Sequence, residues 1–251
     1  MESIARIKEI LENTDIKDLH EALNNFREDE RSGVKNLVKK YDNKLEKYNL
    51  ELIRLEKMHL YENKYSEFNL ICGIDEVGRG PLAGPVMAAA VILPKDCNIL
   101  RVNDSKKLSA KVREELYEEI TQKAVTWAVG SASPERIDEI NILNATYEAM
   151  REAISKLTPS PDLLLNDAVT IPSVSIRQVP IIKGDAKSIS IACASIIAKV
   201  TRDRLMEQYD EIYPEYGFAS NKGYGSSTHI EALKKYGKCA IHRDTFIKNF
   251  I

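Results

Sequence analysis

The most constraining feature of this chain is a short apolar segment that runs directly into two acidic residues. Residues 70–74 read LICGI and are followed at once by Asp75 and Glu76. An apolar run of this length is typical of a strand that is buried on both faces of a sheet. Two carboxylates at the end of such a strand are costly unless a positive charge compensates them. The segment therefore predicts a sheet in which something positive faces these two acids.

A glycine turn follows the two acids. In Gly78-Arg79-Gly80 the two glycines allow the backbone to turn sharply or to approach a ligand closely. Taken alone, this motif favours a structural interpretation, in which Arg79 pairs internally beside an acidic strand end. Motifs further along the chain favour a functional interpretation instead.

Composition describes an ordinary globular protein. The chain has 251 residues, 43% of them hydrophobic and 29% charged, with a net charge of -2, so no global basic field indicates nucleic acid. Its four cysteines form no C-x-x-C pair, which argues against a zinc site or a disulfide framework. We find no signal peptide and no apolar run of ~18 residues, and we expect a cytoplasmic protein without a membrane span.

Residues 1–66 differ from the rest of the chain and are predicted to form an N-terminal helical extension. They contain one glycine, no proline and dense charges of both signs. Apolar residues at helical spacing predict two short amphipathic helices, and a heptad-like seam from Val34 to Leu55 predicts a longer one. We favour a helical hairpin that packs on itself or on the main domain. A coiled-coil dimer and a nucleic-acid-binding arm are the alternatives.

Residues 67–251 mix strands with helices and are predicted to form one α/β domain that ends in C-terminal helices. Predicted strands cover residues 70–74, 83–93, 124–132, 162–166 and 179–183. Predicted helices cover 109–122, a short segment opened by Ser133-Pro134, 142–156, 189–213, and a last helix capped by Ser227 that ends before Gly237. This order favours a mixed five-stranded sheet with helices on its faces.

Acidic residues occur where three of the predicted strands end. They are Asp75-Glu76, Asp167 and Asp185. If these four carboxylates converge, their repulsion in a site of low dielectric requires raised pKa values or a bound cation. Hard carboxylate oxygens favour Mg²⁺ or Mn²⁺ over zinc, and two such ions ~4 Å apart can promote attack of water on a phosphodiester.

Five motifs together resemble the signature of bacterial ribonuclease HII, within the ribonuclease H-like superfamily. They are IDEVGRGPLAGP from Ile74, DSKKL from Asp104, KGDAKS from Lys183, ASIIAKVTRD from Ala194 and KGYG from Lys222, in the order of the family. The resemblance covers about residues 69–246. A Gly-Arg-Gly rather than a Gly-Thr-Gly favours the HII type over the related HIII type.

The resemblance implies a ribonuclease H-like fold and a metal-dependent endoribonuclease that uses two Mn²⁺ or Mg²⁺ ions. It implies hydrolysis of the RNA strand of RNA–DNA hybrids and incision 5′ of ribonucleotides embedded in duplex DNA, giving 3′-hydroxyl and 5′-phosphate ends. Asp75, Glu76, Asp167 and Asp185 match the catalytic, metal-binding acids of the family, although Asn166 stands where the family usually has an apolar residue. A monomer is expected.

Substrate contacts are also implied by the resemblance. Gly78, Arg79 and Gly80 should read the 2′-hydroxyl and the adjacent phosphate, and Tyr224 should pack against the sugar at the RNA–DNA junction. Five lysines near the motifs are candidate phosphate contacts: Lys106, Lys107, Lys183, Lys187 and Lys222. The histidines, Cys193 and Ser195 are interpreted as structural.

Two rival functions remain. A non-catalytic nucleic-acid-binding protein on the same fold is disfavoured, because binding a polyanion has no use for buried negative charge. Another nuclease of this fold, such as a DNA resolvase, is disfavoured by the Gly-Arg-Gly and Tyr224 motifs.

Overall fold

The computed structural model describes residues 2–251, and its contacts divide the chain into two compact units. One unit ends at Lys57 and the other is Met58–Ile251. The helices of the first unit are α1 (Ile4–Asn13), α2 (Leu19–Asn24) and α3 (Ser32–Met58). They pack on one another around a shared core that contains Ile7, Leu11, Leu19, Leu23, Val34 and Tyr41. The three predicted helices are therefore present, and they bury their apolar stripes against each other.

The second unit is built on a mixed five-stranded sheet, as predicted. Its strands are β1 (Ile71–Val77), β2 (Val86–Ile92), β3 (Thr126–Ala132), β4 (Leu163–Asp167) and β5 (Arg177–Ile181). The order across the sheet is β3-β2-β1-β4-β5. β1 is antiparallel to β2 and parallel to β4, and β4 is parallel to β5. β1 therefore lies at the centre of the sheet, and β4 lies beside it and runs in the same direction.

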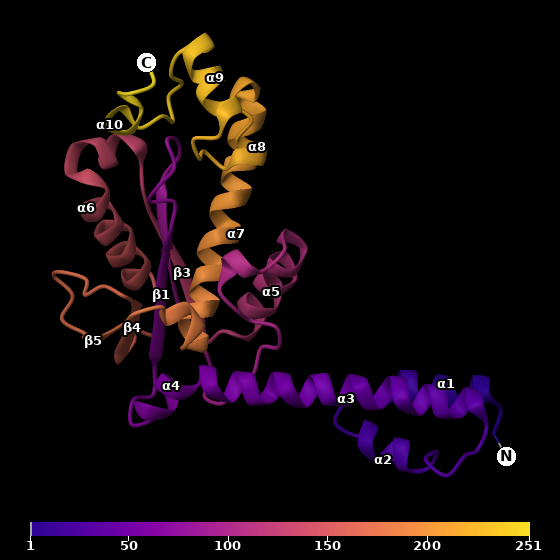
Figure 1. Ribbon diagram of the computed structural model, residues 1–251. Helices are drawn as coiled ribbons and strands as arrows, with labels where there is room; N and C mark the ends of the chain where they lie inside the picture. Colours follow the sequence, from indigo (N-terminus) through magenta and orange to yellow (C-terminus); the bar gives the residue numbers. More distant parts are fainter. Residues whose placement is uncertain (1) are drawn as a thin grey trace. The chain divides into compact units, whose positions relative to one another are not determined.

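Helices cover both faces of this sheet (Figure 1). The larger ones are α5 (Ala110–Lys123), α6 (Pro134–Ser155) and α7 (Ile189–Ile212). α6 packs on β2 and β3, whereas α7 packs on β1 and β2. α7 comes so close to β1 that a Cβ at Gly73 would lie 2.1 Å from the carbonyl carbon of Ser190. Only glycine at position 73 permits this approach.

Short elements complete the second unit. They are α4 (Leu60–Lys64), η1 (Ser105–Lys107), η2 (Gly184–Ala186), η3 (Pro214–Tyr216), α8 (Phe218–Asn221), α9 (Ser227–Tyr236) and α10 (Asp244–Ile247). The C-terminal elements share a core that contains Met206, Tyr216, Phe218 and Leu233. None of the helices within residues 2–251 has both the length and the apolar character that a membrane span requires.

Several predicted boundaries were wrong. Asp75 and Glu76 lie inside β1 rather than after it, because the pairing with β2 continues to Val77. β5 begins earlier than predicted, at Arg177, since the pairing with β4 sets its register. The helix cap is Ser226, whose hydroxyl accepts the N–H of His229, and not Ser227. That helix is not the last one, because α10 follows it.

The prediction of two helices after β3 corresponds to a break within α6. Asn141 has a left-handed φ of 68°, and its side-chain oxygen accepts the N–H groups of Leu143 and Asn144. Asn141 therefore starts the second half of α6 much as a cap residue does.

Candidate active site

The sheet places Asp75 and Glu76 on β1 and Asp167 on β4, the strand beside it. Ile74 pairs with Asn166 in the parallel register of β1 and β4, so Asp75 and Asp167 follow at the same level. Asp185 lies in η2, directly after β5, and the N–H of Gly184 donates to Asp167 Oδ1 at 2.7 Å. This bond fixes the start of η2 against the end of β4.

Asp75 is the most buried of the four, with 7% of its surface exposed. Burial raises the pKa of Asp75 well above 3.8, and the charges of Glu76 and Asp167 raise it further. A hydrogen bond from Ser195 on α7 opposes this rise. The Ser195 hydroxyl also lies 2.9 Å from that of Ser105, so a pair of buried hydroxyls supports the carboxylate from the α7 side. Ser195, which we interpreted as structural, is therefore a neighbour of the site.

Glu76 and Asp185 experience the same crowding of negative charge. Burial raises the pKa of Glu76, and the charge of Asp167 adds to the rise, while Arg79 lowers it. Burial likewise raises the pKa of Asp185, together with the charges of Asp104 and Asp167. The four predicted acids thus interact with one another, and Asp104 is a fifth carboxylate in the cluster. Its signal in the sequence was the DSKKL motif, whose acid we did not assign.

The donor set suits hard divalent cations. It consists of carboxylate oxygens, and Glu76 Oε2 is buried without a hydrogen-bond partner. Burial and the repulsion between neighbouring carboxylates raise the pKa values of Asp75, Glu76 and Asp185, and the opposing charges of Arg79 and Lys106 do not cancel these rises. Within residues 2–251 no three acidic, histidine or cysteine side chains form a ready-made metal cluster. The residues fit such a cation chemically, although their carboxylates are not already drawn together around one point.

The glycine loop (Gly78–Gly80) lies next to the tyrosine loop (Lys222–Gly225). A Cβ built on Gly80 would lie 3.8 Å from Tyr224 Cε1, and this ring is 47% exposed. Gly80 and Arg79 are also exposed, whereas Gly78 is buried with a φ of 87°. Arg79 contacts Glu76 at 3.3 Å. The internal pairing of Arg79 therefore occurs, and it leaves the rest of the loop open to a ligand.

Two buried arginines lie beneath these loops, and neither was assigned a role from the sequence, although Arg202 belongs to the ASIIAKVTRD motif. Arg202 of α7 donates to the carbonyl oxygens of Ala83, Pro85 and Lys222 at 2.9–3.1 Å. Arg243 donates to the carbonyl oxygens of Gly78, Arg79 and Gly84. More than 100 residues separate each arginine from its partners near β1. Only the tertiary structure therefore shows which carbonyl groups each arginine binds.

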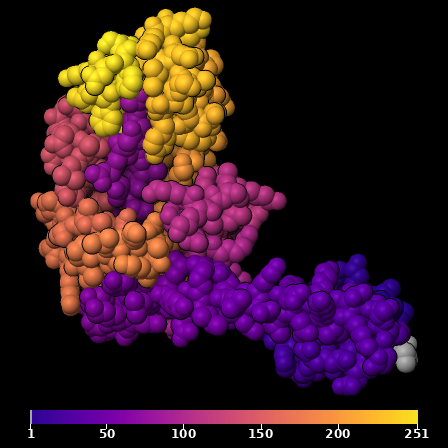
Figure 2. Space-filling model, viewed as in Figure 1, coloured from indigo at the N-terminus to yellow at the C-terminus, as the bar shows by residue number. Residues whose placement is uncertain are grey.

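The five lysines differ in their surroundings. Lys106, Lys107, Lys183 and Lys187 are exposed, and the charge of Lys106 lowers the pKa of Asp185. Lys222 instead pairs with Glu207 at 2.6 Å and is mostly buried. In the space-filling view, part of the purple segment that contains β1 is visible beside the gold and yellow C-terminal surface (Figure 2). The segment that carries β1 and β2 thus borders the C-terminal elements on this face.

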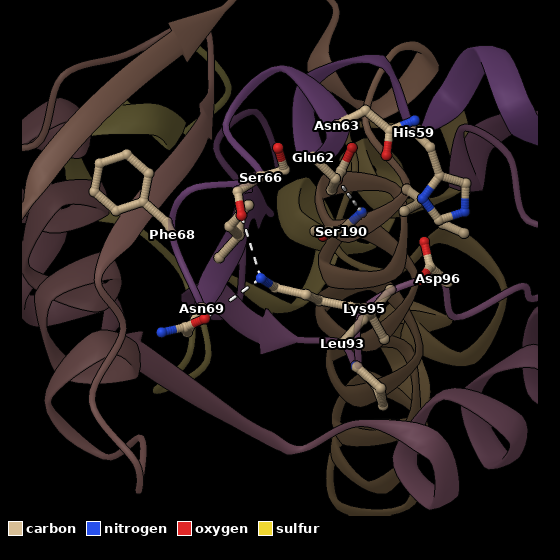
Figure 3. A pocket seen from close by; sticks show the side chains of 13 residues that line it. His59, Glu62, Asn63, Ser66, Phe68, Asn69, Leu93, Lys95, Asp96 and Ser190 are labelled. Carbon is tan, nitrogen blue, oxygen red and sulfur yellow. Dashed lines mark hydrogen bonds between the residues drawn. The ribbon is translucent and has the colours of Figure 1, made fainter.

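A separate cavity of about 220 Å³ lies at α4 and the opposite end of β1. Figure 3 shows Lys95 bonded to Ser66 and Asn69 within it, and Glu62 bonded to Ser190. Glu62 also accepts the hydroxyl of Ser188, which caps α7. None of the predicted site residues lines this cavity. Glu62 therefore anchors the start of α7 and does not belong to the acidic cluster.

Comparisons with known proteins place both parts of the chain in one family. The family model described as Ribonuclease HII matches residues 72–249, and that of the Ribonuclease HII N-terminal domain matches residues 3–66. The chain is 67% identical to the Ribonuclease HII of Lachnoclostridium phytofermentans over 88% of its length and 87% of the relative's. It is 53% identical to that of Clostridioides difficile, over 99% and 98%.

This chain belongs to the ribonuclease HII family. It is therefore a hydrolase, an endoribonuclease of the ribonuclease H type, and membership implies activity on RNA–DNA hybrids. The preference for HII over HIII, drawn from the Gly-Arg-Gly motif, is confirmed.

Solved structures confirm the ribonuclease H-like fold. Ribonuclease H2 from Pyrococcus horikoshii OT3 is 30% identical with a TM-score of 0.59, and the match covers 70% of this chain and 93% of that one. The match to a PCNA:RNase HII complex from Archaeoglobus fulgidus has 33% identity and a TM-score of 0.60, over 69% and 93%. Bst-RNase HIII in complex with Mn²⁺, at 18% identity and a TM-score of 0.52, shares the fold, over 67% and 63%.

Proposed function

We propose that this enzyme cuts the RNA strand of RNA–DNA hybrids and also incises duplex DNA on the 5′ side of an embedded ribonucleotide. The products would carry 3′-hydroxyl and 5′-phosphate ends. The observation that carries the proposal is that Asp75, Glu76, Asp167 and Asp185 lie close enough to influence one another, beside two exposed loops in which a glycine backbone faces an exposed tyrosine ring.

In this proposal the four carboxylates hold two divalent cations, Mg²⁺ or Mn²⁺. When bound there, the cations supply activation of water and stabilisation of the leaving oxygen. Glu76 Oε2, which has no hydrogen-bond partner, is free to act as a ligand. Ser195 would keep Asp75 oriented through its hydrogen bond. The Mn²⁺ complex of a related fold supports this choice of ion class.

The two loops would select the substrate. The exposed backbone of Gly80 can both donate to and accept from a 2′-hydroxyl, and that group distinguishes RNA from DNA. Arg79, 44% exposed beside Glu76, can reach the adjacent phosphate with its guanidinium. Tyr224 would pack on the sugar at the junction, since its ring already lies against the space above Gly80. Exposed Lys106 would add a phosphate contact near Asp185.

Three broader expectations stay proposals. We place a helical extension at residues 1–66 and the catalytic domain at 67–251, which the two family matches support, whereas the contacts divide the chain after Lys57. We expect a monomer. We expect a cytoplasmic enzyme.

Cleavage of a labelled DNA duplex that carries one ribonucleotide tests the function. The controls are an all-DNA duplex and a long RNA–DNA hybrid, each with Mg²⁺, with Mn²⁺ and with chelator. We expect metal-dependent incision 5′ of the ribonucleotide, no cut in all-DNA, and the stated product ends by mass spectrometry. Cutting of all-DNA would favour the resolvase-like function, and binding without any cleavage would favour the binding protein.

Asp75→Asn tests the catalytic assignment. We expect a loss of cleavage of about 10³-fold or more, because one cation loses its most buried ligand, while binding of the hybrid remains. The matched control is Asp96→Asn, which changes an exposed aspartate outside the cluster. Substantial residual activity in Asp75→Asn would remove Asp75 from the catalytic set.

A further inference from the structure

Two buried histidines form a continuous hydrogen-bonded chain beneath the tyrosine loop. His229 Nε2 lies 3.0 Å from His242 Nε2, and both side chains are buried. His229 Nδ1 lies 2.9 Å from the carbonyl oxygen of Tyr224. At the other end, the N–H of Cys239 donates to His242 Nδ1 at 2.9 Å. The chain therefore runs from Cys239 through both rings to the backbone of Tyr224.

The donors and acceptors of this chain allow one arrangement of protons. His242 Nδ1 accepts from a backbone N–H, so the proton of this ring lies on Nε2. That proton is donated to His229 Nε2, which is then an acceptor. The proton of His229 lies on Nδ1 and is donated to the Tyr224 carbonyl. Both rings are consequently neutral, with opposite tautomers.

Arg243, the next residue along the chain, holds the glycine loop in a similar way. Its guanidinium is fully buried and donates to the carbonyl oxygens of Gly78, Arg79 and Gly84. Its own N–H donates to the carbonyl oxygen of Leu82 at 2.9 Å. A planar fork with fixed donor directions can hold three carbonyl groups only if they keep one relative orientation.

Adjacent residues thus hold both substrate-facing loops. The segment that follows the glycine loop also bonds to the tyrosine loop, because the N–H of Leu82 donates to the carbonyl oxygen of Gly223 at 2.8 Å. A Cβ built on Gly78 would lie 2.3 Å from the Nε atom of Arg202. The glycine loop therefore packs tightly against Arg202 and cannot move closer to it. The loops and the segment that carries His242 and Arg243 therefore form one hydrogen-bonded body.

We propose that His242 and Arg243 are positioning residues that fix Tyr224 and the Gly78–Gly80 backbone in one register for recognising the RNA–DNA junction. Arg243 acts on the glycine loop directly, and His242 acts on Tyr224 through His229. The proposal rests on the proposed function of these loops. It assigns junction selectivity to residues that touch neither the substrate nor the carboxylates.

The test uses a selectivity ratio measured on the full-length enzyme. The ratio divides kcat/KM for the duplex with one embedded ribonucleotide by kcat/KM for a long RNA–DNA hybrid. We expect His242→Ala and His229→Ala to lower this ratio about tenfold, because Tyr224 loses its fixed position. His229→Asn, whose amide can still donate to the Tyr224 carbonyl, should recover part of it. His20→Ala, a change of an exposed histidine in the first unit, is the control.

A double-mutant cycle separates positioning from a general structural effect. In a Tyr224→Ala background, His242→Ala should lower the ratio no further, because the residue through which it acts has gone. Arg243→Lys should lower kcat/KM on both substrates about tenfold, and by a smaller factor in a Gly80→Ala background. Equal factors in both backgrounds would overturn the proposal.

The outcomes also distinguish this proposal from the function on which it rests. If Tyr224→Ala leaves the ratio unchanged, the junction role of Tyr224 fails. If Tyr224→Ala lowers the ratio and His242→Ala does not, only the positioning proposal fails. If the alanine variants do not fold, ¹⁵N NMR of the wild-type imidazoles still tests the proposed hydrogen-bonded chain. We expect a proton on His229 Nδ1 and on His242 Nε2 at neutral pH, and the opposite tautomers or a charged ring would contradict the proposal.

Discussion

The acidic residues at the end of β1, Asp75 and Glu76, resist ionisation because they are buried and close to other carboxylates. Asp75 shows this most clearly, since burial and the charges of Glu76 and Asp167 all raise its pKa. A folded protein that must ionise such a group loses stability relative to its unfolded chain, where the carboxyl is hydrated. The fold therefore contains a destabilising cluster of acids, and groups with perturbed pKa values of this kind gather at functional sites.

Asp75→Asn should stabilise the protein in the presence of chelator at neutral pH. The pKa of Asp75 is raised above 3.8, so above about pH 4 the folded state binds more protons than the unfolded state, and stability falls as pH rises through this range. Removing the carboxyl should raise the free energy of unfolding by about 1 kcal/mol or more at pH 7, with little effect near pH 4.

Thermal denaturation in chelator at several pH values measures this difference, with Asp96→Asn as the control. Added Mg²⁺ or Mn²⁺ should then raise the Tm of the wild type more than that of Asp75→Asn. An equal response of the two proteins to metal would argue against a cation at Asp75.

His242 should give stability the opposite dependence on pH. Burial, with the charge of a protonated His229, lowers the pKa of His242 to about 4 from an ordinary 6.5. The unfolded state therefore binds the proton first, and stability is lost as pH falls from about 6.5 towards about 4. In His242→Gln this loss should shrink by up to about 1.4 kcal/mol per pH unit. Urea denaturation at pH 7, 5.5 and 4.5 measures the free energy of unfolding of both proteins. If it depends on pH equally in the wild type and in His242→Gln, the lowered pKa of His242 is contradicted.

At the scale of elements, the site depends on how closely α7 packs on β1. α7 carries Ser195 towards Asp75 and Arg202 towards the loops, and both placements need the helix to lie directly on the strand. Gly73 makes this possible, because a Cβ there would meet the backbone of Ser190 and Ile191 within 2.3 Å.

Two glycine substitutions should separate packing from substrate contact. Gly73→Ala should destabilise the protein by about 3 kcal/mol or more, since α7 must shift away from β1. Gly80→Ala should leave the Tm almost unchanged, because its Cβ meets only the Tyr224 ring at 3.8 Å, while cleavage falls about tenfold or more as the methyl group fills the space for the sugar. Thermal denaturation and cleavage assays of both variants decide; normal cleavage by Gly80→Ala would indicate that no ligand approaches this backbone.

At the scale of the whole molecule, the chain contains two units with separate cores. The helices of the first unit bury Leu23 among their own apolar side chains, and the sheet and its helices bury Leu165 in the second. The four acids proposed for catalysis, the two loops and the supporting arginines and histidines all belong to Met58–Ile251.

Leu23→Ala should therefore destabilise the helical unit without removing cleavage. A buried leucine truncated to alanine costs about 2–5 kcal/mol. Hydrogen exchange should show loss of protection confined to the unit that ends at Lys57, with kcat/KM on the hybrid retained. Leu165→Ala is an equivalent change in the second core. It should lower both the hydrogen-exchange protection of the second unit and kcat/KM on the hybrid. Loss of cleavage in Leu23→Ala would show that catalysis needs the intact helical unit.

The sequence by itself was enough to predict the five strands and the larger helices, and to propose four acids that the structure places near one another. Apolar runs of strand length and apolar stripes of helical period are local signals, and the DEVGRG, KGDAKS and KGYG motifs carry their residues within a few positions. Asn166 shows the limit of such reading. It departs from the apolar residue usual there, and the structure explains it, because its amide donates to Gln178 and to the carbonyl oxygen of Val169.

Only the tertiary structure determined what supports those motifs. Ser195 meets Asp75, Arg243 meets Gly78, and His242 meets His229 across gaps that no local pattern spans. A buried arginine or histidine has no periodic signature, because its position follows from which carbonyl groups and rings the packed helices leave unpaired. The chain's motifs thus predict the chemistry, whereas the fold selects the residues that hold that chemistry in place.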